Sequence, residues 1–159
     1  MIRWQWCALP ELSAAEIYAV MEARARVFVV EQRCAYLDLD GYDLAAQHLV
    51  AWSSTSSTDV AAYLRVLAPS TKYAERSIGR VITSAAFRGQ GLGRELMARG
   101  VEQLDQLFPT QPIRIGAQAH LAAFYGSFGF TRASEPYIED GIPHIEMYRA
   151  GRGASQTLV

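Results

Sequence analysis

The sequence predicts a single α+β domain in which several antiparallel strands precede a glycine-rich turn and a long amphipathic helix. Two observations support this fold class. Strand patterns over residues 48–52 and 60–67 are joined by a polar turn rich in Ser and Thr, which is typical of a hairpin. A further strand pattern over residues 78–83 leads through a short turn into a helical pattern over residues 91–108. The expected order is β-α-loop-β-β-β-α-β-α-β-β.

Length and composition favour one domain over residues 1–150. Of the 159 residues, 50% are hydrophobic, which is enough apolar surface for a single core. Residues 151–159 are mostly small and polar, and we expect this tail to fray. Two cysteines, Cys7 and Cys34, have no metal-ligand spacing, so we expect packed free thiols.

The charge balance argues against several classes of partner. The chain has 15 basic and 16 acidic residues, a net charge of −1, so nucleic acid or an anionic membrane is not expected as its main partner. No apolar run reaches the roughly 18–20 residues of a membrane span. Residues 1–6 lack the apolar segment of a signal peptide, and we expect a cytoplasmic protein. The oligomeric state stays open, with a homodimer as one alternative.

The N-terminal part begins with a strand over residues 4–9 and a helix over residues 14–30. Ser13 and Glu16 have the spacing of a capping box, in which each side chain binds the backbone N–H of the other residue. Apolar residues then follow at helical spacing as far as Phe28.

Residues 31–47 look irregular but contain regularly spaced acids. Asp38, Asp40 and Asp43 lie close together, with Gly41 between them. Calcium loops also use closely spaced oxygen ligands, but the pattern of about 12 residues and its terminal Glu are missing. We therefore expect no metal. A solvated turn, a structural role and contact with an acceptor substrate remain as alternatives.

Short elements alternate in the C-terminal part. The helix after the glycine-rich turn presents one apolar face, made of Leu92, Leu96, Met97, Val101, Leu104 and Leu107. Beyond it we expect a strand, a short helix that Gly129 ends, a second strand, a turn and a last strand. In that order, these five elements are expected over residues 113–117, 119–128, 130–137, 139–143 and 144–148.

The glycine-rich turn is the first candidate functional feature. Arg88-Gly89-Gln90-Gly91-Leu92-Gly93 joins the strand to the start of the helix. Glycines let a backbone approach a ligand closely, and the free N–H groups of a helix N-terminus attract anions. The spacing fits neither the nucleoside-triphosphate loop nor the dinucleotide fingerprint. The turn is therefore either a phosphate-binding loop or an ordinary helix start.

The motif Arg88-x-x-Gly91-x-Gly93, placed after a strand, resembles the acetyl-CoA pyrophosphate loop of the GNAT N-acetyltransferase superfamily. This resemblance implies a three-layer fold with helices flanking a mixed, largely antiparallel sheet of roughly six to seven strands. The sheet would splay open between its fourth and fifth strands, where CoA binds. Residues 31–47 take the place of the family's second early helix.

A second motif extends the resemblance. Gln118, Tyr125 and Gly129-Phe130 occupy the positions of an Asn, a Tyr and a Gly-Phe pair that GNAT enzymes commonly carry. The resemblance implies that Tyr125 is the general acid that protonates the leaving thiolate, and a phenol remains protonated at neutral pH. Residues 26–32, 116–120 and 139–144 narrow the likeness to the ElaA-like branch of GNAT proteins.

The resemblance also implies the residues that bind the CoA moiety. The backbone of the fourth strand would pair with the pantetheine, and an amide there would stabilise the oxyanion. The glycine-rich turn would bind the pyrophosphate, with added positive charge from arginine. The implied set is Val81, Ile82, Thr83, Arg88, Gly89, Gln90, Gly91, Leu92, Gly93, Arg94, Gln118 and Tyr125.

The acceptor amine must lose a proton, but the sequence does not single out one general base. Ile113 stands where some GNAT enzymes have a Glu. The candidates are Glu31, Asp40, Asp43, His120 and His144. Among these side-chain types an imidazole titrates nearest neutral pH, and the resemblance implies that the turn before His144 lies near the acceptor, which favours His144. A hydrogen-bonded structural histidine is the alternative for this residue. Glu31 is an alternative base or acceptor contact, and the acids Asp40 and Asp43 would suit a cationic acceptor.

The sequence thus predicts an acetyl-CoA-dependent N-acetyltransferase. The acetyl group would pass to a primary amine of a small molecule, peptide or protein by direct attack in a ternary complex, without a metal. Two alternatives remain. Phe28 and Glu31, followed by the Asp38 to Asp43 acids, resemble acyl-homoserine-lactone synthases. A non-catalytic CoA-binding or regulatory module of the same fold is the other.

Overall fold

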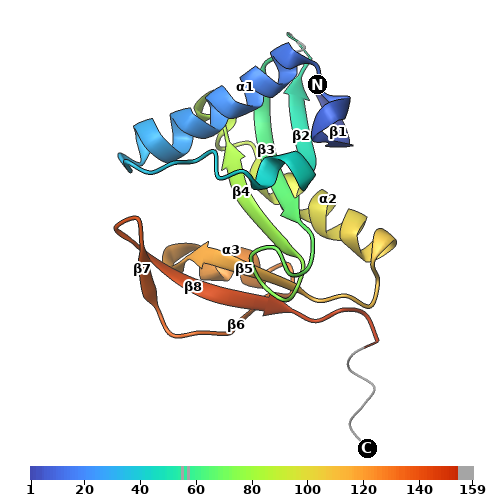
Figure 1. Ribbon diagram of the computed structural model, residues 1–159, viewed down its shortest axis with the longest axis vertical. Coiled ribbons are helices and arrows are strands. Elements are labelled where there is room, and N and C mark those ends of the chain that lie inside the picture. The colour runs from blue at the N-terminus through green and yellow to red at the C-terminus, as the bar shows by residue number, and fades with distance from the viewer. Residues whose placement is uncertain (55, 57, 154–159) are drawn as a thin grey trace, which may run out of the picture.

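Figure 1 shows the computed structural model, which describes residues 1–54, 56 and 58–153. The strands are β1 Ile2–Ala8, β2 Gln47–Ser53, β3 Val60–Leu67, β4 Ser77–Thr83, β5 Ile113–Gln118, β6 Thr131–Arg132, β7 Tyr137–Glu139 and β8 Ile142–Arg149. The α-helices are α1 Ala14–Ala25, α2 Leu92–Leu107 and α3 Ala122–Gly126. None of the helices in these described ranges is long and apolar enough to cross a membrane.

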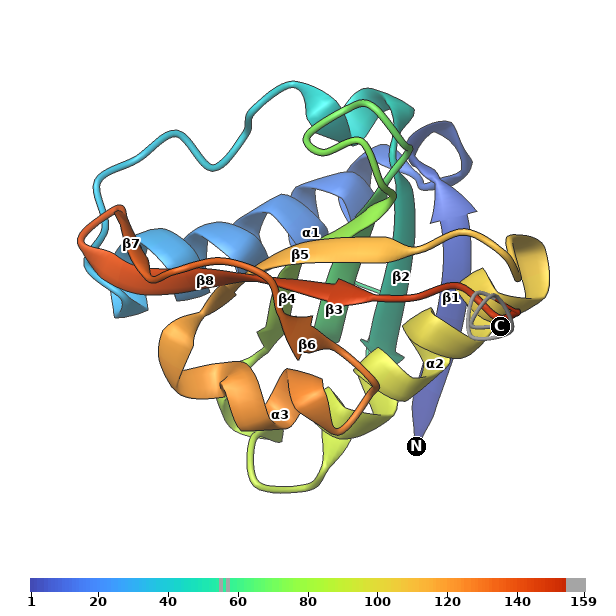
Figure 2. The ribbon, with the colours of Figure 1, turned by 90° about the horizontal axis from the view of Figure 1, so that it is seen from below.

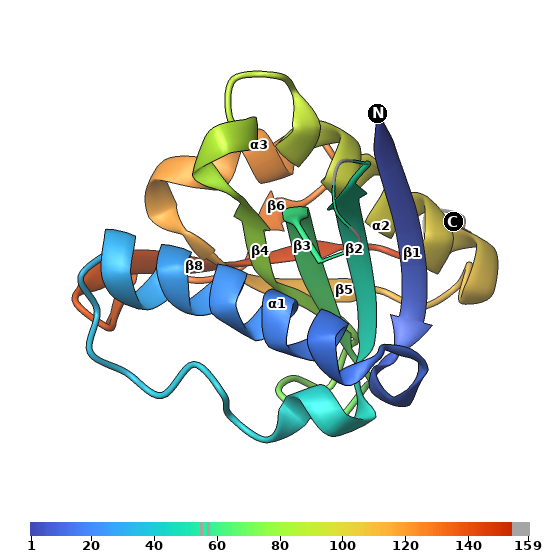
Figure 3. The same cartoon turned by 90° about the horizontal axis from the view of Figure 1, so that it is seen from above.

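The first sheet has the strand order β1-β2-β3-β4, and each neighbouring pair is antiparallel. Helix α1 covers one face of this sheet and α2 covers the other (Figures 1 and 3). Successive residues of β2 point to opposite faces. Leu49 and Ala51 therefore pack in the core under α2, whereas Val50 and Trp52 pack under α1. The predicted hairpin is confirmed, although positions 55 and 57 of its turn lie outside the described residues.

The second sheet is built around β8, which pairs antiparallel with β5, β6 and β7. The two sheets meet through a parallel bridge between Arg76 and Ile113, where the Arg114 N–H donates to the Arg76 carbonyl at 2.9 Å. Beyond this point, no strand ladder among the described residues joins β4 to β5. The predicted α+β fold with a mixed, largely antiparallel and splayed sheet is confirmed.

Helix α1 begins at the predicted capping box. The Ser13 hydroxyl accepts the Glu16 N–H at 3.1 Å, and the Glu16 carboxylate accepts the Ser13 N–H at 2.8 Å. Helical structure continues through a π-helical turn, Arg26–Glu31, so the predicted extent of this helix is confirmed. Such turns recur at functional sites. This one carries Phe28 to the wall of the cavity described below.

Three details of the C-terminal prediction were wrong. The strand expected over residues 130–137 is divided into β6 and β7: the Ser134 hydroxyl, instead of a backbone carbonyl, accepts the Glu146 N–H at 2.8 Å, and Pro136 has no N–H to continue a ladder. The helix expected over residues 119–128 is a 3-10 turn, Ala119–Leu121, followed by the short α3. Leu107, the last residue of α2, is 49% exposed instead of packed in the core.

Both cysteines are free thiols, as predicted. Cys7 is packed under α1, and burial raises the pKa of its thiol to about 11. Cys34 is only half-buried, and its sulfur lies 3.3 Å from the Asp140 carbonyl at the edge of the second sheet.

Candidate active site

A cavity of about 430 Å³ lies at the opening between β4 and β5. Residues of β4, β5 and β8 line it, together with residues from the segment that follows α1. The segment 84–91, which leads into α2, and the segment 33–45 flank this opening from opposite sides (Figures 2 and 3).

The glycine-rich turn has the geometry of an anion-binding loop. Gly89 and Gly91 have φ values of 80° and 76°, in the left-handed region that favours glycine. Gly91 is the N-cap of α2 and supplies no capping side chain, so the first N–H groups of this helix are open to a ligand. At Gly93 a Cβ would lie 3.2 Å from the Thr83 hydroxyl oxygen, so glycine lets α2 start close against β4.

Two arginines of this region are already bound within the protein. The Arg88 guanidinium donates to the Thr83 carbonyl at 3.0 Å and pairs with Glu31 at 2.6 Å. The Arg94 guanidinium donates to the Ser127 hydroxyl at 2.9 Å and lies over aromatic rings of α3 and the following turn. Glu31 does not line the cavity, and its carboxylate faces Arg88 of the glycine-rich turn.

Strand β4 has a bulge in the cavity wall. Its register with β3 pairs Tyr63 with Ile82 and Arg65 with Gly79, so one residue of β3 faces two of β4. The first of these two, Arg80, has a φ of 53°. A non-glycine residue in this conformation costs about 1–3 kcal/mol and requires support from its surroundings. The bulge leaves a backbone group of the cavity wall outside the ladder.

Tyr125 projects from α3 into the wall of the same cavity. Its side chain is 8% exposed and packs edge-to-face against Phe124 and Phe130, with ring centroids 5.2 and 6.4 Å apart. Burial raises the pKa of Tyr125 to about 12. The phenol is therefore a neutral proton donor at physiological pH, which is the state that the predicted acid requires.

His144 and Gln118 lie opposite each other on β8 and β5, and both line the cavity. The His144 Nδ1 lies 2.7 Å from the Ile142 carbonyl oxygen. A carbonyl only accepts, so Nδ1 carries the proton, and the neutral ring has its lone pair on Nε2. That nitrogen lies 3.6 Å from a Glu139 carboxylate oxygen. Gln118 is 3.5 Å from the Gln32 side chain.

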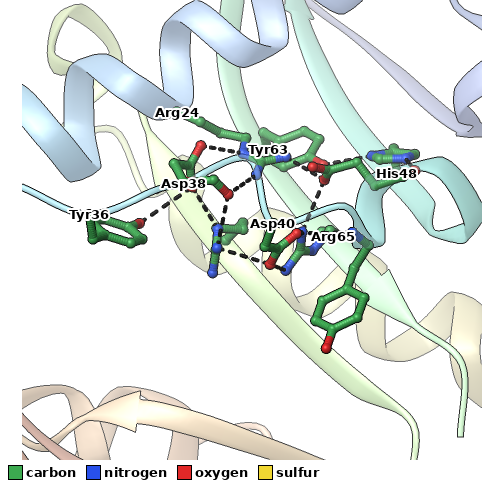
Figure 4. A network of polar contacts seen from close by, with 10 residues as sticks. Arg24, Tyr36, Asp38, Asp40, His48, Tyr63 and Arg65 are labelled. Carbon is green, nitrogen blue, oxygen red and sulfur yellow. Dashed lines mark hydrogen bonds and ion pairs between the residues drawn. The ribbon is translucent and has the colours of Figure 1, made fainter. Parts of the chain in front are cut away.

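The acids of the segment 33–45 belong to a network of ion pairs with arginines from three other elements (Figure 4). Asp38 accepts from Arg24 of α1 at 3.0 Å and from Arg80 of β4 at 2.7 Å. Asp40 accepts two hydrogen bonds from Arg65 of β3, at 2.7 and 2.8 Å. The remaining pairs join Asp43 to Arg24 at 2.5 Å and to Arg65 at 3.1 Å, and Asp40 to Arg80 at 3.1 Å.

This network overturns the interpretation of the acids as a solvated turn. Asp38 and Asp43 are 6% exposed, and the carboxylates are matched by arginines. Asp43 does not line the cavity, so the structure gives it a structural place instead of the predicted acceptor contact. Asp40 lines the cavity, and its side chain is 23% exposed.

Sequence reasoning missed the arginine half of this network. Arg24, Arg65 and Arg80 were not singled out, although each interrupts an apolar helix face or strand pattern. Arginine is rarely buried without a partner. An arginine within an apolar pattern, in a chain that also has closely spaced acids, was therefore the available signal for buried ion pairs.

The remaining predicted residues differ in where the structure places them. Val81 lines the cavity, whereas the side chains of Ile82 and Leu92 are buried in the two cores. His120 is exposed and does not line the cavity. Among the residues that the structure describes, no group of three or more His, Cys, Asp or Glu side chains is placed to hold a metal ion.

The Asp40 ion pairs predict a loss of stability in acid. Burial alone would raise the pKa of Asp40, but hydrogen bonds from Arg65 and the Tyr42 N–H lower it to about 2. A carboxyl group with a lowered folded-state pKa stabilises the fold above its unfolded pKa and loses that contribution as the pH falls through the folded value. We therefore expect Asp40 to contribute a fall of about 2 kcal/mol in the free energy of unfolding between pH 4 and pH 2.

Urea denaturation at a series of pH values measures this fall. Asp40→Asn should show a shallower pH dependence than the wild type, whereas Asp59→Asn, a change at an exposed turn residue, should leave the slope unchanged. Equal slopes for wild type and Asp40→Asn would contradict the assignment.

Comparison with known proteins identifies the family of this chain. A family model described as an acetyltransferase (GNAT) domain matches residues 21–150. The chain is 44% identical to protein ElaA of Escherichia coli over 151 residues, covering 94% of this chain and 97% of ElaA. The crystal structure of E. coli ElaA matches with a TM-score of 0.85, covering 94% of this chain and 99% of that one.

Two further solved structures share the fold. An acyl-CoA N-acyltransferase from Pseudomonas aeruginosa matches with a TM-score of 0.87 and 43% identity, covering 94% of this chain and 100% of that one. A CoA-dependent acyl-homoserine lactone synthase, BjaI, matches with a TM-score of 0.74 over 96% of this chain and 84% of its own, at 17% identity. The second likeness concerns the fold alone.

Proposed function

The chain belongs to the GNAT acetyltransferase family and is ElaA-like, and from this premise we propose that it transfers an acetyl group from acetyl-CoA to a primary amine. One observation carries the proposal. The cavity between β4 and β5 has Tyr125 in its wall, and the short segment after β4 leads to the open N-terminus of α2 at Gly91. A phosphate site and a proton donor thus flank one opening of the sheet.

The glycine-rich turn fits the pyrophosphate of the donor. Gly89 and Gly91 adopt a backbone conformation that other residues rarely tolerate, and a pyrophosphate would accept from N–H groups at the start of α2. Arg88 would add positive charge once the pyrophosphate competes for its pair with Glu31. This turn supports a CoA thioester as the acyl donor.

The transfer itself needs a proton donor on the sulfur side. The amine nitrogen attacks the thioester carbonyl, a C–N bond forms and the C–S bond breaks. The leaving thiolate takes the proton of the Tyr125 hydroxyl, which burial keeps protonated. A backbone N–H at the β4 bulge, next to Val81, would stabilise the negative charge on the carbonyl oxygen.

The acceptor must also lose a proton, and His144 is the base that the geometry favours. In the neutral ring Nε2 carries the lone pair, because Nδ1 donates to the Ile142 carbonyl. The Glu139 carboxylate, 3.6 Å from Nε2, would stabilise the ring once it has taken the proton. The proton of the amine would pass to Nε2, directly or through water. Glu31 is less suited, because its carboxylate pairs with Arg88 outside the cavity lining. The acceptor is a small molecule, a peptide or a protein amine, with Asp40 as a polar contact.

Thiol release from acetyl-CoA on addition of amines tests the proposal. The panel comprises simple primary amines, amino acids, polyamines, and peptides with a free N-terminus or a lysine. We expect amine-dependent thiol release together with an acetylated product of matching mass. Tight CoA binding without release for every amine would contradict an enzyme and favour a non-catalytic CoA-binding module.

An acyl-homoserine-lactone synthase is the other alternative, and the same assay separates it. S-adenosylmethionine would then serve as the amine, with an acyl-CoA as donor, and a lactone would form. The Arg88-x-x-Gly91-x-Gly93 loop, followed by an open helix N-terminus, argues for the acetyltransferase. We further propose a cytoplasmic location, and a homodimer stays a prediction.

A further inference from the structure

The left-handed residue of the β4 bulge is Arg80, although a glycine precedes it. Gly79 would adopt a positive φ without strain, yet the positive φ of 53° falls on Arg80. Crowding does not explain the glycine at position 79, because a Cβ there would meet nothing within 4 Å. The position of the bulge therefore depends on contacts of the Arg80 side chain.

Those contacts come from the segment that follows α1. The Arg80 Nε donates to an Asp38 carboxylate oxygen at 2.7 Å, and its Nη2 donates to the Asp38 carbonyl at 3.0 Å and to Asp40 at 3.1 Å. The guanidinium also lies over the rings of Phe28 and Tyr36, 6.0 and 5.7 Å from their centroids. Charge, hydrogen bonds and stacking together fix the guanidinium, and through it the backbone of β4.

Asp38 and Asp40 are themselves fixed by two further arginines, Arg24 and Arg65. Arg24 is fully buried in α1 and donates to both the carboxylate and the carbonyl of Asp38, at 3.0 and 3.1 Å. Arg65 is 2% exposed in β3 and holds both carboxylate oxygens of Asp40. Figure 4 shows the labelled acids lying between these arginines. Buried acids that are fixed in this way give Arg80 a rigid attachment.

We propose that Arg80 is a positioning residue: Asp38 and Asp40 hold its guanidinium, and Arg80 holds the β4 bulge so that a backbone N–H there meets the acyl carbonyl. The role in catalysis rests on the proposed acetyl transfer. The hydrogen bond from the bulge to the acyl carbonyl, however, can be measured in bound acetyl-CoA without any turnover. The attachment of Arg80 gives the acidic segment a role in the reaction in addition to the polar contact that Asp40 would make with the acceptor.

Arg80→Gly tests the inference. Glycine accepts a positive φ, so the variant is expected to fold, but the bulge loses its attachment. We expect kcat to fall by roughly 10²-fold, as misplaced catalytic groups commonly cause, with CoA affinity by calorimetry unchanged. In isotope-edited infrared spectra of bound acetyl-CoA labelled at the carbonyl carbon, the wild-type band should lie below that of free acetyl-CoA and return toward it in the variant.

Two further variants complete the experiment. Arg80→Lys keeps the charge but lacks the planar fork, and it should show the same spectral change. Arg114→Gln removes an ion pair of the same length, 2.7 Å to Glu75, from the neighbouring strand, and it should change neither the band nor kcat.

The inference is overturned if folded Arg80→Gly keeps both the shifted band and the wild-type kcat, or if its defect is confined to CoA affinity. A wild-type band at the free position would also overturn it, even if acetyl transfer occurs. If no amine supports turnover, but the carbonyl band lies below the free position in the wild type and returns toward it in Arg80→Gly, the proposed function fails and the positioning role stands.

Discussion

Replacing Gly91 with Asp is expected to weaken CoA binding by roughly 100-fold or more. Gly91 is the N-cap of α2 with a φ of 76°, a conformation that Asp tolerates better than most residues, so the fold should survive. The new carboxylate would face the pyrophosphate at short range, where like charges near a protein surface repel by several kcal/mol. Isothermal titration calorimetry with CoA measures the loss.

Gly91→Asn is the matched control, because it adds the same bulk and tolerates the same backbone without adding charge. We expect Asn to weaken binding by only a few-fold, and the extra defect of Asp to shrink at high salt. An Asp variant that binds CoA as tightly as the wild type would place the phosphate site elsewhere.

Most of the fold could be predicted from patterns of residues that are close in sequence. The capping box of Ser13 and Glu16, the hairpin around the 53–59 turn and the strand–turn–helix around Gly91 depend on residues close in sequence. Such features are set by backbone hydrogen bonds and steric preferences within a few residues, so one sequence is enough to predict them. The division of residues 130–137 by Pro136 had a local signal too, which outweighs the strand pattern around it.

The acidic segment could not be predicted in the same way. Asp38 meets Arg24, Arg80 and Tyr36, which lie on a helix, a distant strand and its own loop, and no periodicity connects these positions. Whether an acid is solvated or buried depends on the tertiary position of its partners. The bulge at Arg80 has the same origin, because local propensity alone would have put the left-handed residue at Gly79.

Tyr125→Phe is expected to lower kcat by about 10²- to 10⁴-fold while acetyl-CoA binding stays near normal. Phenylalanine keeps the edge-to-face packing against Phe124 and Phe130, so the cavity wall should hold its shape. Only the proton for the leaving thiolate is lost. Thiol release with the best amine of the panel measures kcat, and calorimetry measures binding.

The pH profile and a second tyrosine make this prediction specific. Because burial raises the pKa of Tyr125 to about 12, loss of its proton should not lower the wild-type rate between neutral pH and about pH 10. Tyr148→Phe, a change on β8 outside the cavity lining, should leave kcat unchanged. If Tyr125→Phe turns over like the wild type, the thiolate takes its proton from solvent or another group, and the role of Tyr125 is reduced to packing.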